Sequence, residues 1–377
     1  MTTLIHSARI VSDGAVTTDG WVLFDRDTIV RVGRDTPPPA TDVVDADGRW
    51  LTPGFVDIHC HGAGGASFDD GADAIGHALA VHRSHGTTRS IISLVTAELP
   101  DLERRLKDVV AVAQLDPLIL GAHLEGPFLD VGHKGAHDPK LLRNATTDAI
   151  DGLIDAGAGW IRQVTIAPEL PGGMAAVERF AVAGIAVAVG HTGADYETTL
   201  EAFARGATIL THAFNGMDGI HHRAPGPVAA ATHTGGVTLE VINDGAHVHP
   251  AVIRLAFAGA PGRIALITDA MAAAGASDGD YVLGGLAVVV TDGVARLRDG
   301  GSIAGSTLTQ DEALRRTVVD VGVPIEVAVD ALTAAPARAV GRAGDLGRLQ
   351  PGYAADAVLL DQDLTVSAVW AAGSRVR

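Results

Sequence analysis

Short apolar runs recur through the middle of the chain, and stretches with helical periodicity separate them. A strand that is buried on both faces reads as a nearly continuous apolar run, and strands that alternate with helices are typical of a parallel sheet. Eight such units predict an α/β fold, a (β/α)8 barrel of the TIM type. The expected strands are Gly54–His59, Thr87–Val95, Leu118–Glu125, Ile161–Pro168, Ile185–His191, Ala207–His212, Val237–Asn243 and Ile264–Asp269.

Both ends of the chain show a different pattern, in which short β-rich runs lie between turn signals. We expect residues 1–52 and 345–377 to pair into one small β-sandwich domain, and residues 53–344 to form the barrel. A further run, Tyr281–Arg298, is predicted to be a hairpin that turns at Thr291-Asp292-Gly293 before the last helices. The terminal strands are expected at Leu4–Val11, Trp21–Phe24, Thr28–Val32, Ala357–Leu360 and Val366–Trp370.

Composition narrows the class of protein. The formal net charge is −17, which opposes extended contact with nucleic acid or with an anionic membrane surface. No stretch supplies the roughly 18 uninterrupted apolar residues that a membrane span needs, and the first residues lack the basic and apolar segments of a secretory signal. The single cysteine, Cys60, excludes an internal disulfide and fits a reducing compartment. We therefore expect a cytoplasmic protein without a nucleic-acid or membrane partner.

Polar residues close five of the predicted barrel strands. A barrel brings the carboxyl ends of its strands to one mouth, where catalytic residues lie. A lone histidine at a strand end usually bonds a loop carbonyl, but that explanation does not account for polar residues on so many strands. These residues are His59 and His61 on the first strand, His123 and Glu125 on the third, His191 on the fifth, His212 on the sixth and Asp269 on the eighth.

Histidine and carboxylate side chains are the usual protein ligands of zinc, and a catalytic zinc keeps one position open for water. Glu125, His191 and His212 are expected to hold one ion. His59 and His61 lie on the same face of their strand, because side chains alternate between its faces. They offer a second position that shares Glu125.

Three other residues complete this interpretation. Asp269 is expected to be a general base beside the first ion, and a helix N-cap is the alternative. Cys60 lies on the opposite face of its strand from the two histidines and is expected to pack into the barrel wall. His123 shares a face with Glu125, and its role stays open between supporting a ligand and contacting a substrate.

Nine segments, spread in order over nearly the whole chain, resemble the N-acetylglucosamine-6-phosphate deacetylase family of the amidohydrolase superfamily. Each segment alone is a weak signal, whereas the combination is specific. The segments are Pro53-Gly54-Phe55-Val56-Asp57, His123-Leu124-Glu125-Gly126-Pro127-Phe128, Lys134-Gly135-Ala136-His137, Gly190-His191-Thr192, Thr211-His212-Ala213-Phe214-Asn215-Gly216-Met217, Arg223-Ala224-Pro225-Gly226, Asn243-Asp244-Gly245-Ala246-His247, Thr268-Asp269-Ala270 and Ile303-Ala304-Gly305-Ser306-Thr307-Leu308-Thr309.

The resemblance implies an enzyme that hydrolyses the acetamide of N-acetylglucosamine 6-phosphate to glucosamine 6-phosphate and acetate. It implies a homodimer with one or two divalent ions, expected to be zinc, in each subunit. By matching position, Asp269 is the catalytic acid and base, and His137 steadies the carbonyl oxygen. The implied phosphate site, which can include residues of a neighbouring subunit, uses Arg223, His247 and the backbone of Asn215 and Gly216. The whole implied substrate-binding set is Ala136, His137, Asn215, Gly216, Arg223, Asp244, His247, Ile303, Ala304 and Gly305.

Several alternatives stay open. Some members of the family lack the first-strand histidines and use one metal, so the presence of His59 and His61 leaves the number of ions undecided. The substrate could instead be N-acetylgalactosamine 6-phosphate. Another amidohydrolase, such as a cyclic amidase or a nucleobase deaminase, would share the metal centre but not the phosphate pocket. An inactive scaffold is the alternative from a different class of protein, and the intact set of site residues argues against it.

Overall fold

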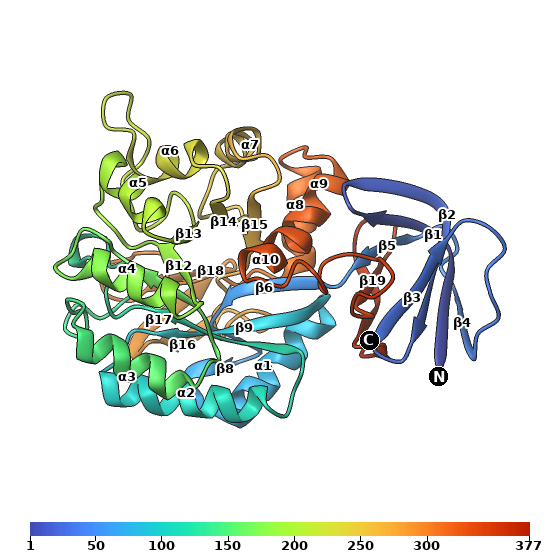
Figure 1. Cartoon of the computed structure of the whole chain (residues 1–377), viewed down its shortest axis with the longest axis horizontal. Coiled ribbons are helices and arrows are strands. Elements are labelled where there is room, and N and C mark those ends of the chain that lie inside the picture. The colour runs from blue at the N-terminus through green and yellow to red at the C-terminus, as the bar shows by residue number, and fades with distance from the viewer.

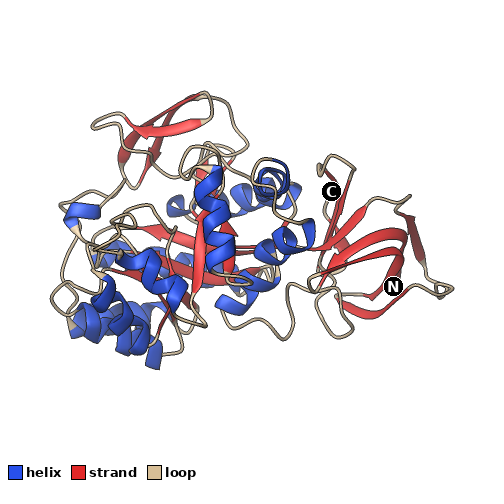
Figure 2. Cartoon of the chain, turned by 90° about the horizontal axis from the view of Figure 1, so that it is seen from above, coloured by secondary structure: helices blue, strands red, loops and turns tan.

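The computed structural model describes residues 1–377 and shows two lobes (Figure 1). The larger lobe holds a parallel sheet with helices around it. The smaller lobe consists of strands and carries both chain termini (Figure 2). None of the helices combines the length and the apolar character that a membrane crossing requires.

Eight parallel strands follow one another in chain order around the larger lobe, which confirms the predicted (β/α)8 barrel. Each observed strand falls on one of the predicted apolar runs, and nearly all of its residues are buried. The strands are β6 (Phe55–Cys60), β9 (Thr87–Val95), β10 (Ile119–Glu125), β11 (Ile161–Ile166), β12 (Ala186–Val189), β13 (Ala207–Leu210), β14 (Thr238–Ile242) and β15 (Ile264–Ile267).

No strand ladder joins the first and last strands, β6 and β15, and the barrel closes there through side-chain and backbone hydrogen bonds. The buried carboxylate of Asp57 accepts the Thr268 hydroxyl at 2.6 Å and the Thr268 backbone N–H at 3.4 Å. Just beyond, the Asp269 N–H donates to the carbonyl of His59 at 2.9 Å. Burial raises the pKa of Asp57 to about 6, against the opposing effect of its hydrogen bonds. This seam fixes His59 and Asp269 beside each other.

Helices follow most of the strands and cover the outside of the barrel (Figure 1). In α2 the buried residues Leu102, Leu106 and Val109 recur at helical spacing and face the sheet. Side-chain caps start three of the α-helices, where Thr146, Asp195 and His249 accept backbone N–H groups. The helices are α1 (Ala72–Ser84), α2 (Leu99–Ala113), α3 (Thr147–Gly157), α4 (Gly173–Val182), α5 (Tyr196–Ala204), α6 (Gly226–His233), α7 (Pro250–Gly259), α8 (Gln310–Val319), α9 (Ile325–Leu332) and α10 (Ala334–Ala339), with short 3-10 turns at Phe68–Asp70 and Val131–His133 and a small hairpin of β7 (Gly62–Ala63) and β8 (Ala66–Ser67).

The smaller lobe is one connected sheet of eight strands, in which the two ends of the chain pair as predicted; the prediction was a sandwich. It curves around one apolar core, in which Phe24 of β2 and Trp370 of β20 are both buried although their strands are far apart in the sheet. Its strands are β1 (Thr2–Ser12), β2 (Ala15–Asp25), β3 (Thr28–Gly33), β4 (Asp42–Asp45), β5 (Trp50–Pro53), β19 (Ala357–Leu360), β20 (Val366–Ala371) and β21 (Ser374–Arg375).

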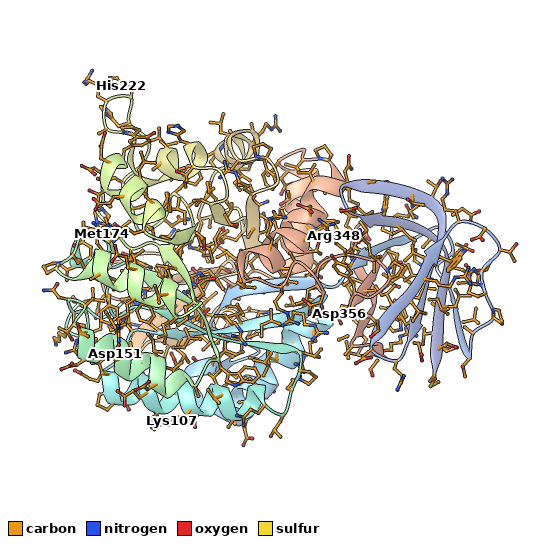
Figure 3. The ribbon with its side chains drawn as sticks, in the orientation of Figure 1. Lys107, Asp151, Met174, His222, Arg348 and Asp356 are labelled. Atoms are coloured by element: carbon orange, nitrogen blue, oxygen red, sulfur yellow. The ribbon has the colours of Figure 1, made fainter.

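A buried ion pair joins the two lobes. The Arg89 guanidinium, on β9 of the barrel, donates to both carboxylate oxygens of Asp356 at 2.6 and 3.2 Å and to the Pro117 carbonyl at 2.7 Å. Asp356 lies where the lobes meet (Figure 3). Its backbone carbonyl also accepts the Gly54 N–H, at the point where the chain enters the barrel. The pair therefore fixes the start of β6, the strand that carries the first histidine.

The segment after β15 differs from its prediction. It forms an antiparallel sheet of three strands, β16 (Gly279–Leu283), β17 (Leu286–Thr291) and β18 (Val294–Leu297), rather than a hairpin. The turn at Asp292-Gly293 is as expected, but a second turn at Gly284-Gly285, with φ values of 55° and 83°, adds the extra strand. One face of this sheet packs on Val95 and Met271. The sheet thus lies against the mouth of the barrel.

Candidate active site

Three of the predicted site residues stand at the same offset from the ends of their strands. His191, His212 and Asp269 each lie two residues beyond the last residue of β12, β13 and β15. Their φ values are positive, at 47°, 24° and 48°. Residues other than glycine rarely adopt this left-handed conformation, which costs on the order of 1–3 kcal/mol for each residue. The fold therefore strains its backbone at the points where these side chains enter the site.

The side chains meet at a cavity of about 390 Å³. Four predicted residues do not line it: His59 and Ala304 are fully buried, Asp244 contacts His247 instead, and Arg223 lies on an exposed loop. The predicted residues that do line it are His61, Glu125, Ala136, His137, His191, His212, Asn215, Gly216, His247, Asp269, Ile303 and Gly305.

Glu125, His191 and His212 form the first group of potential metal ligands. Each imidazole donates from Nδ1 to a backbone carbonyl, that of His133 at 2.8 Å for His191 and that of Asn215 at 3.1 Å for His212. A neutral ring bonded in this way presents only a lone pair at Nε2. The two Nε2 atoms lie 3.0 Å apart, and each lies 3.2 Å from Oε1 of Glu125. Such acceptors repel one another unless a cation or an added proton lies between them.

The second group consists of His59, His61, Glu125 and Asp269. Nε2 of His61 lies 3.2 Å from Oε2 of Glu125 and 3.2 Å from Oδ1 of Asp269, and Nε2 of His59 lies 3.3 Å from Oε1 of Glu125. Burial by itself lowers the pKa of His61, but hydrogen bonds to Asp269 and Glu125 raise it to about 9. Protons and cations therefore compete for these imidazoles.

The position of Asp269 corrects one expectation. The carboxylate was expected beside the ion of the first group, but it falls in the second group, with Oδ1 3.5 Å from Nε2 of His59. The reason is the closure of the barrel, since the seam sets β15 beside β6 and away from β12 and β13. Burial raises the pKa of Asp269, but the charges of His59 and His61 and the hydrogen bond from His61 together lower it below its usual value, so the group is ionised at neutral pH.

The two groups fit divalent cations. Four buried carboxylates lie in or next to them, those of Asp57, Glu125, Glu240 and Asp269. No lysine or arginine pairs with any of the four; their ion pairs are with histidines alone. Buried negative charge requires compensation by nearby positive charge. Converging imidazole nitrogens with carboxylate oxygens are a donor set typical of zinc and similar ions.

His137 stands next to the ligands, with Nε2 3.6 Å from Oε2 of Glu125. The hydroxyl of Thr96 lies 2.9 Å from its Nδ1 and holds the ring in place. Burial lowers the pKa of His137 to about 4, although a hydrogen bond to Glu125 acts in the other direction. The imidazole is therefore neutral at pH 7 and carries a single N–H.

His247 lines the cavity, and its surroundings favour the positively charged form of its imidazole. Its Nδ1 donates to Oδ2 of Asp244 at 2.7 Å, and Oδ1 of Asp244 accepts the backbone N–H groups of Ala246 and His247. Burial by itself lowers the pKa of His247, but the hydrogen bond to Asp244 and the charges of Asp244 and Asp269 together raise the pKa above its usual value. Asp244 thus acts by orienting and charging His247, not by lining the cavity.

The backbone N–H groups of Asn215 and Gly216, in the turn after β13, were both expected to bind phosphate, but only one of them is free to do so. The Asn215 N–H donates to the His212 carbonyl at 3.0 Å, whereas the Gly216 N–H has no partner within the chain. Gly216 has a φ of 59°, and a Cβ there would lie 2.9 Å from Nδ1 of His191. A side chain at this position would press on a potential ligand, so glycine matters for more than its backbone N–H.

Arg223 does not line the cavity. The loop that carries it projects from the barrel, and its neighbour His222 marks the tip in Figure 3. Residues 219–224 are all exposed. The sequence pattern could not show this separation, because a motif gives order along the chain and not distance from the mouth.

Sequence reasoning missed several residues of the site. Glu240 on β14 forms a hydrogen bond with His59. In the sequence it could have been found as a charged residue inside an otherwise apolar run. His123, whose role was open, lies between the hydroxyls of Ser93 and Thr165 at 2.9 Å each and supports the site without reaching the cavity. Cys60 is buried in the barrel wall, as expected. The other lining residues that were missed are Val95, Gly135, Phe214, Leu283 and Ser302.

Comparisons with known proteins agree with the geometry. Residues 50–376 match the model of the amidohydrolase family. The chain is 37% identical to an N-acetylgalactosamine-6-phosphate deacetylase of Escherichia coli O157:H7, over 99% of both chains. It is 33% identical to the N-acetylglucosamine-6-phosphate deacetylase of Vibrio furnissii, over 99% of this chain and 93% of that protein.

Among solved structures, a mutant N-acetyl-D-glucosamine-6-phosphate deacetylase of Mycobacterium smegmatis in complex with N-acetyl-D-glucosamine-6-phosphate has a TM-score of 0.95. It is 42% identical, and the match covers 100% of this chain and 99% of that one. Family model, relatives and structure agree over nearly the full length of the chain. The chain therefore belongs to the amidohydrolase superfamily and, within it, to the N-acetylglucosamine-6-phosphate deacetylase family, whose members are hydrolases.

Proposed function

We propose that the protein deacetylates N-acetylglucosamine 6-phosphate to glucosamine 6-phosphate and acetate. The observation that carries this proposal is a single cavity lined both by potential metal ligands and by a group suited to an anion. Glu125, His191 and His212 mark an end suited to a metal ion, and His247 supplies a cation elsewhere in the lining. A substrate with an amide and a phosphate on one small sugar matches both. A cyclic amide or a nucleobase would leave the cationic part of the cavity without a partner.

The residues present suit the steps of amide hydrolysis. A bound divalent ion, which we propose to be zinc, supplies polarisation of the amide carbonyl and acidifies water. Asp269 is ionised and accepts the proton of the attacking water, and it then returns that proton to the departing amine. His137 is neutral and donates its N–H to the carbonyl oxygen as that oxygen gains charge.

We propose that the phosphate is bound by His247, by the Gly216 N–H and by Arg223 of a second subunit. Arg223 is remote from the cavity of its own chain and lies on a projecting loop, which is the arrangement expected if the loop reaches the neighbour in a homodimer. An imidazolium, a guanidinium and a backbone N–H together form a site suited to a phosphate on an otherwise acidic protein.

Arg223→Ala should lower kcat/KM for the phosphorylated sugar by about 10- to 150-fold, because a charge-assisted hydrogen bond contributes roughly 1.5–3 kcal/mol. The loss should nearly vanish for the unphosphorylated sugar. His222→Ala, on the same exposed loop, is the matched control and should behave like the wild type. Equal losses on both sugars would show that Arg223 does not bind the phosphate.

Mixed dimers test which subunit receives the arginine. In a dimer of one Arg223→Ala chain and one His191→Ala chain, one cavity has its own His191 and the partner's Arg223. If the arginine crosses the interface, mixing the two weak variants restores activity, up to one working cavity in each mixed dimer. If the arginine serves its own chain, no mixture exceeds the better of the two variants.

Turnover of four sugars tests the function as a whole. These are N-acetylglucosamine 6-phosphate, its galacto epimer and the unphosphorylated form of each. We expect the gluco phosphate to have the highest kcat/KM. A faster galacto phosphate would assign the chain to the alternative substrate, which one of its relatives is named for. No turnover of either phosphate would refute the proposal.

A further inference from the structure

Glu240 is a fully buried carboxylate that lies outside the cavity yet touches both ligand groups. Its Oε2 lies 3.0 Å from Nδ1 of His59 and 3.3 Å from the backbone N of His212. Its Oε1 accepts the side-chain amide of Gln163 at 2.7 Å. One side chain on β14 therefore connects ligands carried by β6 and β13, two strands that are not neighbours in the sheet.

The contact with His59 determines which ring nitrogen faces the second ligand group. A carboxylate only accepts, so Nδ1 of His59 carries a hydrogen, and the neutral ring that binds a metal presents its lone pair at Nε2. That Nε2 is the atom near Glu125 and Asp269. A carboxylate behind a metal-binding imidazole also increases the basicity of the ring and so its strength as a ligand.

The contact with His212 supports the first ligand group. The backbone at His212 has a φ of 24°, a conformation that persists only where its surroundings hold it. Glu240 supplies that support twice, because its side chain accepts the His212 N–H and its backbone carbonyl accepts the Ala213 N–H at 2.8 Å. The peptide N–H groups before and after the Cα of His212 are thus both bonded to Glu240.

We propose that Glu240 is a positioning residue that supports a ligand of each of the two metal positions. Its charge and its hydrogen bond prepare His59 as a ligand, and the same carboxylate holds the turn of His212. The proposal rests on the metal centre of the proposed function, but it does not depend on which sugar is cleaved. It is therefore tested by metal binding in the absence of any substrate.

The neighbour Gln163 makes a conservative test possible. In Glu240→Gln the new amide can still accept from His59, and Gln163 can turn its Oε1, which has no partner in the native protein, toward the new amide. This variant removes the charge and keeps the hydrogen bonds. The double variant Glu240→Gln with Gln163→Glu exchanges the two side chains. It restores the negative charge, but places it on residue 163, which does not contact His59. If Glu240 only fills the barrel, both variants should bind metal as the wild type does.

The experiment measures zinc in the purified full-length protein by elemental analysis during titration with a chelator. We expect Glu240→Gln to weaken the affinity for one zinc equivalent by about 10- to 100-fold, the range seen when such supporting partners are lost. The double variant should recover part of that loss. Nitrogen-15 spectra of labelled histidine, with His59→Asn used for assignment, should show the Nδ1–H of His59 weakened in Glu240→Gln.

Unchanged zinc affinity in a folded Glu240→Gln protein would overturn the proposal. If Glu240→Gln does not fold, zinc affinity is measured in the double variant instead. Wild-type zinc affinity there would exclude a role for the charge next to His59. Absence of turnover on the proposed sugar would refute the proposed function and leave the zinc titration valid. The two failures are thus distinguishable.

Discussion

His191→Ala is expected to abolish deacetylation, with a fall in kcat of at least ~10³-fold. The change removes one of the three ligands in the group formed with Glu125 and His212. Polarisation of the carbonyl contributes several kcal/mol, and each 1.4 kcal/mol corresponds to a factor of about ten in rate. Elemental analysis should show the loss of metal together with the loss of rate, while circular dichroism shows a folded barrel.

The matched comparison is the double change of His59 to Gln and His61 to Asn. It should remove about one metal equivalent and leave measurable deacetylation, because the ligands of the first group stay intact. If the double variant is as inactive as His191→Ala while still folded, both ions are needed for the reaction. The expectation that deacetylation survives loss of the second ion must then be abandoned.

Asp269→Asn should lower kcat by at least ~10²-fold, the scale of general acid and base catalysis. Asparagine keeps the size of the side chain and an oxygen near His59 and His61, but it does not take up a proton at neutral pH. Because Glu125 and both histidines of the second group remain, metal content should stay near that of the wild type. Rate and metal content are measured on the same preparation.

Asp280→Asn is a suitable control, since that carboxylate is exposed on β16 and pairs with Arg298 outside the cavity. It should change neither rate nor metal. A loss of metal from Asp269→Asn, in step with its loss of rate, would make Asp269 a ligand rather than the base. The position of Oδ1 close to two imidazoles makes this measurement the decisive one for its role.

The barrel and most of the site were predictable from local patterns. Strands buried on both faces leave continuous apolar runs, and the polar residues that end them, from His59 to Asp269, mark the mouth. What local patterns do not contain is the relation between distant strands. The seam that sets Asp269 beside His61, the reach of Glu240 across the barrel and the projection of the Arg223 loop all depend on closure of the sheet.

The closing seam also has a consequence for the order of folding. Asp57 and Thr268, which form it, are 211 residues apart in the chain. A contact of such long range forms late, since the loop it closes must first lose its freedom. During synthesis, Asp269 leaves the ribosome long after His59, so the second ligand group does not exist until the barrel is nearly complete. Metal bound there stabilises only the closed state, and its uptake therefore reports that the last barrel strand has docked.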